Sequence, residues 1–492
     1  MNKKTSQKKI QRDFEKLLRE LKQKDAFIHY QREHETGPIH LGYLKTAIDT
    51  DKLEKYIMPR LQEYMYQNLN ELKDHIPFTK TELTDDADQI PDKLVKSFVF
   101  IYMANVSPSY LLIPLPLDEK RQVSVPEVEF SVVGPKEAFV EDIDTNLNLV
   151  RKRLAIPELN VKKLRVGTIT KTDVAVVSIA GIADEDNVKT AVQRIKDVDI
   201  DQVVDSSFIQ QTIADNKNSP FPQLLDTERP DRIASILVEG KVAIFVNGSP
   251  HVLLGPTTLI EFFSAFEDYF LNWLTASSFR LIRLIAVFFS ILITPLYVAV
   301  LTHHFEIVPQ TMLTTLVNSR MQVPFPPIIE ALVLEFAIEL LREAGARLPT
   351  KIGQTIGIVG GIVIGTAAVE AGITSNVLLI LVALAALGSF TTPVYKMSNT
   401  IRLIRFPLII VASVYGLIGL AISIAYIMVH LLRLTSLGRP FFAPIFPFRF
   451  ADFKDALIRL PFSMQNKRPF QVRPSKVKRP VANENDKLRD SR

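Results

Sequence analysis

Residues 324–372 read PFPPIIEALVLEFAIELLREAGARLPTKIGQTIGIVGGIVIGTAAVEAG, and this stretch indicates a membrane protein. Its second half is an apolar run in which glycines recur at every fourth position: Gly353, Gly357, Gly361 and Gly365. Glycines at this spacing lie nearly on one helix face and allow a second helix to approach closely. Its first half places carboxylates among apolar residues, at Glu330, Glu335 and Glu339. Carboxylates inside a membrane are costly, so they are candidates for a functional role.

The rest of the chain divides by composition. Residues 1–280 are rich in charge, whereas residues 284–432 are dominated by Leu, Ile, Val, Ala and Gly. The 492 residues correspond to about three domains on a prior of roughly 150 residues each. The start of the chain is basic and has no apolar core of the kind found in a secretory signal. We therefore expect residues 1–280 to fold on the cytosolic side.

The soluble half contains an internal repeat. Residues 105–114 (NVSPSYLLIP) and 247–256 (NGSPHVLLGP) agree at six of ten positions, and each copy follows an apolar run typical of a strand. Both are predicted to form β-hairpins. Upstream of each hairpin a strand ends in an acidic turn, with Asp49 in one copy and Asp184 in the other. These carboxylates are interpreted as helix caps, with a duplicated ligand site as the alternative.

These patterns predict an α/β soluble head of two related subdomains, followed by an all-α polytopic membrane domain of four to five segments. The predicted segments are 284–302, 328–341, 355–372, 376–393 and 406–432. The predicted regions are a basic N-terminal segment (1–30), two α/β subdomains (31–130 and 131–280), a transmembrane domain (281–435) and a basic C-terminal tail (436–492).

The orientation of these segments is ambiguous. The sequence Arg-Leu-Ile-Arg occurs before the first segment at 280–283 and before the last at 402–405. If both copies lie in the cytosol, segment 328–341 must cross the membrane and the basic tail lies outside, against the positive-inside rule. If segment 328–341 lies in the interface, the tail returns to the cytosol but the second copy faces out.

The sequence gives little support to an enzyme. It lacks Cys, and its glycine-rich run lies inside an apolar helix rather than in a phosphate-binding loop. We therefore expect no catalytic residue, no metal site and no cofactor. Residues 1–24 and 463–492 each carry nine Lys or Arg against three acids. These termini suit contact with lipid headgroups or with solvent, and the absence of interleaved aromatics argues against nucleic-acid binding.

The acidic helix has two interpretations. Glu335, Glu339 and Glu343 share one helix face, while Glu330 lies roughly 140° away. In an oligomer, Glu335, Glu339 and Glu330 would line an ion path as acidic rings that favour cations. Alternatively, the helix lies at the membrane surface with its acids in water. A different lining is the small-residue helix, where an apolar gate would consist of Ile358, Val359, Ile362 and Val363.

Several ordered motifs resemble the A subunit of the GerA-type spore germination receptors. The motifs are GPKEAFVEDIDTNLNLVRKRL (134–154), RVGTITKTDVAVVSIAGIADEDNV (165–188), SPFPQLLDTERPD (219–231), VEGKVAIFVNGSPHVLLGP (238–256), VPFPPIIEALVLEFAIELLREAGARLP (323–349) and KIGQTIGIVGGIVIGTAAVEAGI (351–373). The resemblance covers about 130–445. The region before it agrees loosely, and the tail after it does not agree.

The resemblance implies a non-enzymatic component of a nutrient receptor in the inner membrane of bacterial endospores. Its implied partners are a transporter-like B subunit, a lipoprotein C subunit, membrane lipid and further copies of itself. The B subunit is thought to hold the nutrient, and the A subunit is thought to oligomerise into a channel-like part that releases ions. The alternative interpretation is a transporter-associated scaffold or signal coupler without its own conductance.

Overall fold

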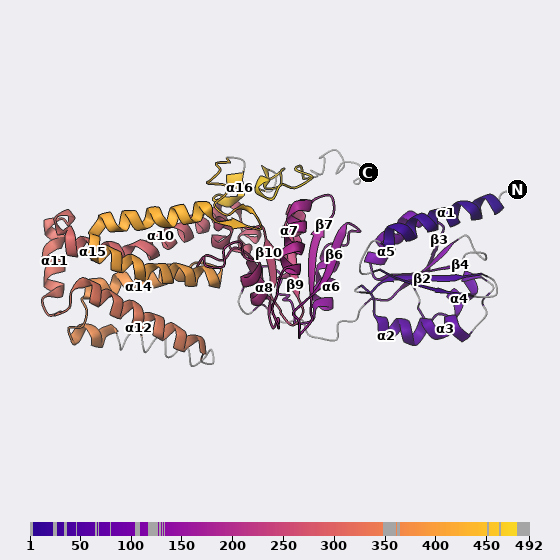
Figure 1. The fold of residues 1–492 in the computed structure, drawn as a ribbon, viewed down its shortest axis with the longest axis horizontal. Helices are drawn as coiled ribbons and strands as arrows, with labels where there is room; N and C mark the ends of the chain where they lie inside the picture. The colour runs from indigo at the N-terminus through magenta and orange to yellow at the C-terminus, as the bar shows by residue number, and fades with distance from the viewer. Residues whose placement is uncertain are drawn as a thin grey trace. The chain divides into compact units, whose positions relative to one another are not determined.

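The structure is a computed structural model (Figure 1). It describes residues 3–22, 27–33, 37–45, 47–63, 66, 68–78, 80–103, 109–116, 126, 129, 131, 133–347, 361, 365–449, 452–461 and 464–479. The chain forms two compact units. The head unit consists of residues 1–217, 224–256 and 466–492, and the helical unit of residues 218–223 and 257–465.

The first part of the head unit is a five-stranded antiparallel sheet covered by helices on both faces (Figure 1). Its strands are β1 (Phe27–Arg32), β2 (Ile39–Leu44), β3 (Glu82–Thr84), β4 (Phe98–Met103) and β5 (Tyr110–Pro114), in the order β1-β2-β4-β5-β3. Successive side chains of a strand point to opposite faces. In β4, Phe100 and Tyr102 therefore join one apolar core, and Val99 and Ile101 join the other.

Each core is completed by its own helices. The face of Phe100 packs against α1 (Lys3–Lys22) and α5 (Ile90–Val95). The opposite face packs against η1 (Leu53–Ile57), α3 (Met58–Glu63) and α4 (Leu69–His75), which follow α2 (Thr50–Lys52). Residues 3–22, predicted only as part of a basic segment, thus belong to the core of the first sheet through Phe14, Leu17 and Leu21.

The second part of the head unit has a sheet with the same strand order. Its strands are β6 (Leu159–Val166), β7 (Thr172–Ile179), β8 (Leu225–Thr227), β9 (Val242–Val246) and β10 (Val252–Gly255), in the order β6-β7-β9-β10-β8. Its helices are α6 (Ile143–Arg153), α7 (Glu185–Lys196), α8 (Ser206–Ile213) and α9 (Pro230–Glu239). The predicted hairpins are confirmed as β4–β5 and β9–β10. The duplication of a single ancestral unit stays a prediction.

The C-terminal residues of the described chain complete this second part. Residues 466–479 include a short turn, η8 (Phe470–Val472), and cross the head beside α7 and α9. The side chain of Asn187 donates to the carbonyl of Val472 at 3.0 Å, and the amide of Ser475 donates to the carbonyl of Ile182 at 2.9 Å. Asn187 and Val472 are both buried. This segment, predicted as a tail, is therefore a structural part of the head.

The helical unit begins at Thr257, before the predicted boundary at 281, because two 3₁₀ turns pack against its first helix. These turns are η3 (Leu259–Phe263) and η4 (Phe266–Phe270). The helices are α10 (Trp273–His303), α11 (Gln310–Arg320), α12 (Pro327–Arg347), α14 (Asn376–Phe390) and α15 (Tyr395–Arg433), with the short turn η5 (Phe305–Ile307) before α11. After α15 come β11 (Thr435–Ser436), β12 (Arg439–Pro440) and α16 (Phe453–Ala456).

Helices α10, α12, α14 and α15 contact one another around an apolar core (Figure 1). The core includes Val298, Ala331, Val382 and Ile409, one from each helix. A Cβ on Gly388 of α14 would lie 2.7 Å from the carbonyl oxygen of Ala286 in α10, so only glycine permits this close approach. Within the described chain, α10 and α15 are long and apolar enough to cross a membrane, and α14 is apolar but shorter.

Helix α15 is broken at Gly416, where the structure differs from the single span predicted over 406–432. Gly416 has φ 59° and ψ −144°, which are not helical values. Thr400 and His430, on either side of the break, would be about 45 Å apart along a straight helix at 1.5 Å per residue. Yet Thr400 donates to the carbonyl of Pro220, and His430 hydrogen bonds Ser219. Helix α15 therefore folds back on itself as a helical hairpin.

Candidate functional site: buried ion pairs of the helical unit

The acidic helix α12 begins with a buried carboxylate. Glu330 is 1% exposed and accepts hydrogen bonds from Arg320, with 2.8 Å between Nη2 and Oε1. Its other oxygen, Oε2, accepts from the backbone amide of Ser375 at 3.1 Å. Ser375 caps α14, so Glu330 lies at a helix N-terminus, where the helix dipole stabilises a negative charge. The carboxylate thus ties α12 to α11 and α14.

The central pair of the unit is Glu335 with Arg405. Nη1 of Arg405 lies 2.7 Å from Oε2 of Glu335, and both side chains are buried. Thr294 of α10 donates to Oε1 of Glu335 at 3.0 Å. The second guanidinium nitrogen of Arg405 donates to Ser290 of α10 at 2.7 Å. A single ion pair therefore joins α10, α12 and the first half of α15.

The third carboxylate lies between two arginines. Oε2 of Glu339 accepts from Arg342 at 2.7 Å, and Oε1 lies 3.1 Å from Nε of Arg402. Arg402 also donates to Ser398 at 2.8 Å. Glu343 pairs with Arg347 one turn further on, with both side chains exposed. Every glutamate of α12 is thus paired with an arginine of the same chain.

The structure brings the predicted acidic residues together with arginines whose charges bear, in the sequence, only on membrane orientation. Arg402 and Arg405 belong to the second Arg-Leu-Ile-Arg motif, whose charge bears on membrane orientation through the positive-inside rule. Both are buried inside the helical unit. The repetition of the motif marks these arginines as unusual, but it does not show that they pair with Glu339 and Glu335, which lie 63 and 70 residues away in sequence.

The predicted glycine face is only partly within the described chain. Gly365 is buried, and a Cβ there would lie 3.5 Å from Leu379, an ordinary contact with α14. Gly361 is exposed, and a Cβ there would meet nothing within 4 Å. The remaining predicted residues lie outside the described residues: Gly353, Gly357, Ile358, Val359, Ile362 and Val363.

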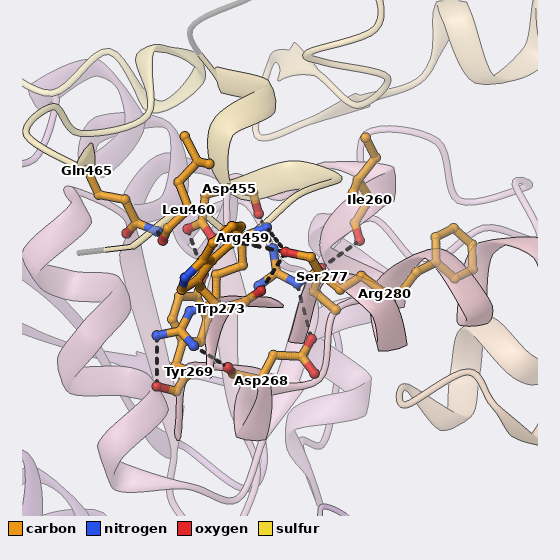
Figure 2. Close-up of polar contacts among 12 residues, drawn as sticks. Ile260, Asp268, Tyr269, Trp273, Ser277, Arg280, Asp455, Arg459, Leu460 and Gln465 are labelled. Carbon is orange, nitrogen blue, oxygen red and sulfur yellow. Dashed lines mark hydrogen bonds and ion pairs between the residues drawn. The ribbon is translucent and has the colours of Figure 1, made fainter. Parts of the chain in front are cut away.

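A second buried polar cluster surrounds the start of α10 (Figure 2). Asp268 of η4 is fully buried and accepts from Arg280 at 3.1 Å and from Arg283 at 3.0 Å. Arg280 also contacts Asp455, whose carboxylate accepts from the hydroxyl of Tyr269 at 2.7 Å. The first Arg-Leu-Ile-Arg motif therefore supplies buried ion pairs, as the second one does.

Arg459 completes this cluster from the C-terminal side of the chain (Figure 2). Its guanidinium donates to three turn carbonyls, those of Asp268 at 2.7 Å, Tyr269 at 3.0 Å and Leu271 at 2.6 Å. Its backbone amide donates to Ser277 at 3.1 Å. Burial lowers the pKa of Arg459, and the nearby carboxylates only partly oppose this shift. We call the set Asp268, Tyr269, Ser277, Arg280, Arg283, Asp455 and Arg459 the anchor cluster.

The acidic turns of the head act as helix caps. Asp49 accepts from the amide of Lys52 at 3.1 Å, and Asp184 accepts from the amide of Asp186 at 2.8 Å. These bonds satisfy amides that a helix start leaves unpaired, which confirms the capping interpretation. Asn247, in the second hairpin turn, accepts from the amide of Ile143 at the start of α6. Within the described residues, no group of three or more His, Asp or Glu is placed to hold a metal ion.

The chain is similar in sequence to bacterial spore germination proteins. A family model described as Bacillus/Clostridium GerA spore germination protein matches residues 8–471. The chain is 48% identical to spore germination protein GerQA of Bacillus cereus over 453 residues, which cover 92% of this chain and 91% of that protein. It is 36% identical to spore germination protein A1 of Bacillus subtilis (strain 168) over 452 residues, covering 92% and 94%. The chain therefore belongs to the GerA family of spore germination proteins.

Among solved structures, the chain is similar to the crystal structure of the N-terminal domain of the A subunit of the Bacillus megaterium spore germinant receptor GerK3. The TM-score is 0.36 and the sequence identity 24%, and the match covers 49% of this chain and 92% of that one.

Proposed function

We propose that this chain is the A subunit of a nutrient germinant receptor and has a role in spore germination. The observation that carries the proposal is the family match over residues 8–471, together with relatives that are themselves named spore germination proteins. In the proposal the chain works without catalysis, beside a transporter-like B subunit and a lipoprotein C subunit, in the inner membrane of the spore.

The finer part of the proposal is a channel-like, oligomeric membrane component that triggers ion release. The long apolar helices α10 and α15 support insertion in a membrane. The contacts of residues 466–479 with the head support a C-terminal tail on the same side of the membrane as the head. We propose that this is the cytosolic or core side, because the charged head precedes every apolar helix.

Two ion paths are compatible with this function. In the first, Glu335, Glu339 and Glu330 line the path. This path requires their arginine partners to move away, because a carboxylate paired at 2.7 Å with a guanidinium adds little net charge. In the second, the small-residue helix lines the path, with Ile358, Val359, Ile362 and Val363 as an apolar gate. The pairing of every α12 glutamate favours the second path.

A matched set of variants distinguishes the two paths in liposomes that contain the full chain. The exchange variant Glu335→Arg/Arg405→Glu keeps the ion pair but moves the carboxylate to another helix. Ion selectivity, measured as the reversal potential under a salt gradient, changes in this variant if Glu335 lines the path and stays constant if it does not. Absence of current from the wild-type chain, with the assembly intact, favours the alternative of a scaffold or signal coupler.

Oligomer formation is tested through the glycine face. Gly361→Leu places a branched side chain on a surface that is open in the single chain. If a second copy covers that surface, the variant loses cross-linked oligomers while the circular dichroism of the head is unchanged. Gly345→Leu, on α12 and also facing open space, is the matched control. Wild-type cross-linking of Gly361→Leu would show that this face contacts lipid.

A further inference from the structure

The loop 218–223 (Asn-Ser-Pro-Phe-Pro-Gln) belongs to the helical unit although the residues on both sides of it belong to the head. Lys217 and Leu224 are part of the head unit, while residues 218–223 pack within the helical unit. Two of the six residues are proline, at 220 and 222. Proline fixes the backbone angle φ near −65°, so this loop is stiffer than most connections of its length.

The loop contacts both halves of the α15 hairpin near their open ends. On the first half, the hydroxyl of Thr400 donates to the carbonyl of Pro220 at 2.5 Å. On the second half, Ser219 and His430 share a hydrogen bond at 2.8 Å. The ring of Phe221 lies against the ring of His430, with 5.9 Å between centroids. The two halves are thus connected through three consecutive loop residues.

The last residue of the loop is held where the chain enters and leaves the membrane helices. The carbonyl of Gln223 accepts from Ser436 at 2.6 Å and from Thr257 at 2.8 Å. The amide of Thr257 donates in turn to the hydroxyl of Ser436 at 3.0 Å. All three residues are buried. Thr257 precedes α10 and Ser436 follows α15. These hydrogen bonds therefore connect the loop to the segments that flank the first and the last long helix of the unit.

We infer that the loop 218–223 is a coupling element that sets the separation of the two halves of α15. A displacement of the head carries the loop with it through the main chain at the two boundaries, 217/218 and 223/224. The stiff Pro-Phe-Pro backbone transmits it to Thr400 and His430. The hairpin is joined at Gly416 but is held at its open ends by the loop. The loop therefore acts on the end of the hairpin that lies opposite the break at Gly416.

The separation is measured directly with spin labels in the full chain. The sequence has no Cys, so cysteines introduced at Leu403 and Tyr426 are the only sites that a thiol label modifies. These side chains are 62% and 74% exposed, and one lies on each half of α15. The distance distribution between the labels is recorded for the labelled parent chain, for Ser219→Ala/Phe221→Ala and for Pro220→Gly/Pro222→Gly. Lys217→Ala, exposed and outside the loop, is the matched control.

We expect one narrow distribution for the labelled parent chain and for Lys217→Ala, and a broader distribution with a longer mean for both loop variants. The glycine variant keeps every side chain that bonds to α15, so its broadening reports loss of stiffness rather than loss of contacts. Unchanged distributions in both loop variants would overturn the inference. Circular dichroism and thermal unfolding of each variant identify chains that have lost their fold. If one of the two loop variants does not fold, the other one tests the inference.

Transmission is measured in spores that carry the chain as their only receptor component of this family. There, the glycine variant is expected to slow nutrient-triggered ion release by at least about tenfold relative to Lys217→Ala. If the glycine variant releases ions at the wild-type rate although its label distribution is broadened, the loop sets the separation of the α15 halves but does not transmit movement of the head. This arm rests on the proposed function. If the wild-type chain itself gives no response, the proposed function fails while the spin-label result still decides the coupling role of the loop.

Discussion

Arg405 and Glu335 form an ion pair inside the helical unit, with 2.7 Å between the guanidinium and the carboxylate and almost no exposure of either side chain. Thr294 and Ser290 of α10 bind the two partners from the side. In an apolar medium neither charge is tolerated alone, so the pair acts as a single neutral polar group. It therefore specifies which faces of α10, α12 and α15 meet.

Removing one partner should be much worse than removing both. Arg405→Ala leaves the carboxylate of Glu335 buried without its cation, and we expect the helical unit to lose about 3–5 kcal/mol of stability. The double variant Glu335→Gln/Arg405→Ala should lose less stability than the single variant Arg405→Ala. Thermal unfolding in detergent of the parent, both single variants and the double variant gives the coupling free energy. Additive losses would show that the pair contributes only packing.

The break in α15 should require glycine. The angles of Gly416 lie in a region essentially restricted to glycine, and a Cβ there would lie 2.8 Å from Nε2 of His304 and 3.0 Å from Cβ of His303. Gly416→Ala should therefore cost about 1–3 kcal/mol, measured by thermal unfolding. Gly345→Ala is the matched control, because it lies in α12 with open space around it and should be neutral or stabilising by up to about 1 kcal/mol. Equal effects would mean that α15 is continuous.

The side chain of Arg459 should hold the C-terminal segment in place. Arg459→Ala removes hydrogen bonds to three carbonyls, and hydrogen bonds to a charged group contribute about 1.5–3 kcal/mol each. We expect amide hydrogen exchange in residues 452–461 to become at least about tenfold faster and protease cleavage to begin there. Arg473→Ala is the control, since that side chain is exposed. Equal exchange rates in Arg459→Ala and Arg473→Ala would show that backbone contacts alone keep residues 452–461 in place.

The first sheet of the head should lose stability in acid. Burial and the positive charges of His29 and Lys22 lower the pKa of His40 to about 4, below its ordinary value of 6.5. Between these values the unfolded chain binds the proton more readily, so stability falls as pH decreases from about 6.5 to about 4 and is fully present above that range. Exchange of β2 amides, corrected for the intrinsic effect of pH, should accelerate over this interval. His40→Phe keeps an aromatic ring but removes the titration of His40, and should reduce the pH dependence. The remaining dependence comes from His29, whose pKa is also lowered by burial.

Local sequence patterns predicted local structure well. Apolar runs bounded by Asn and Pro predicted the β4–β5 and β9–β10 hairpins, because turn residues and strand residues lie next to each other in sequence. The same holds for Asp49 and Asp184, whose bonding partners lie within three residues. The apolar segments also predicted the positions of α10, α14 and α15, although their lengths differ.

Features that depend on distant partners were not predictable. Arg405 pairs with Glu335, which lies 70 residues away in sequence, and a single sequence does not show which distant residues are in contact. Gly416 lies among apolar residues, as a glycine inside a continuous apolar helix also would. The neighbouring sequence therefore does not predict that α15 breaks there. Arg280 and Arg283 were interpreted by charge alone, and their pairing with Asp268 depends on how η4 folds back onto α10.

The placement of residues 452–479 imposes an order on biosynthesis. Asp455 and Arg459 complete the anchor cluster at the start of α10, and Val472 covers Asn187 in the head. A ribosome produces these residues only after α10, α11, α12, α14 and α15 have been made. Until then Asp268 pairs with Arg280 and Arg283, but the contacts that Asp455 and Arg459 make with this cluster are missing and the Val472 contact with Asn187 is not formed. A chain truncated before residue 452 therefore lacks contacts in both units at once, at the anchor cluster and beside α7.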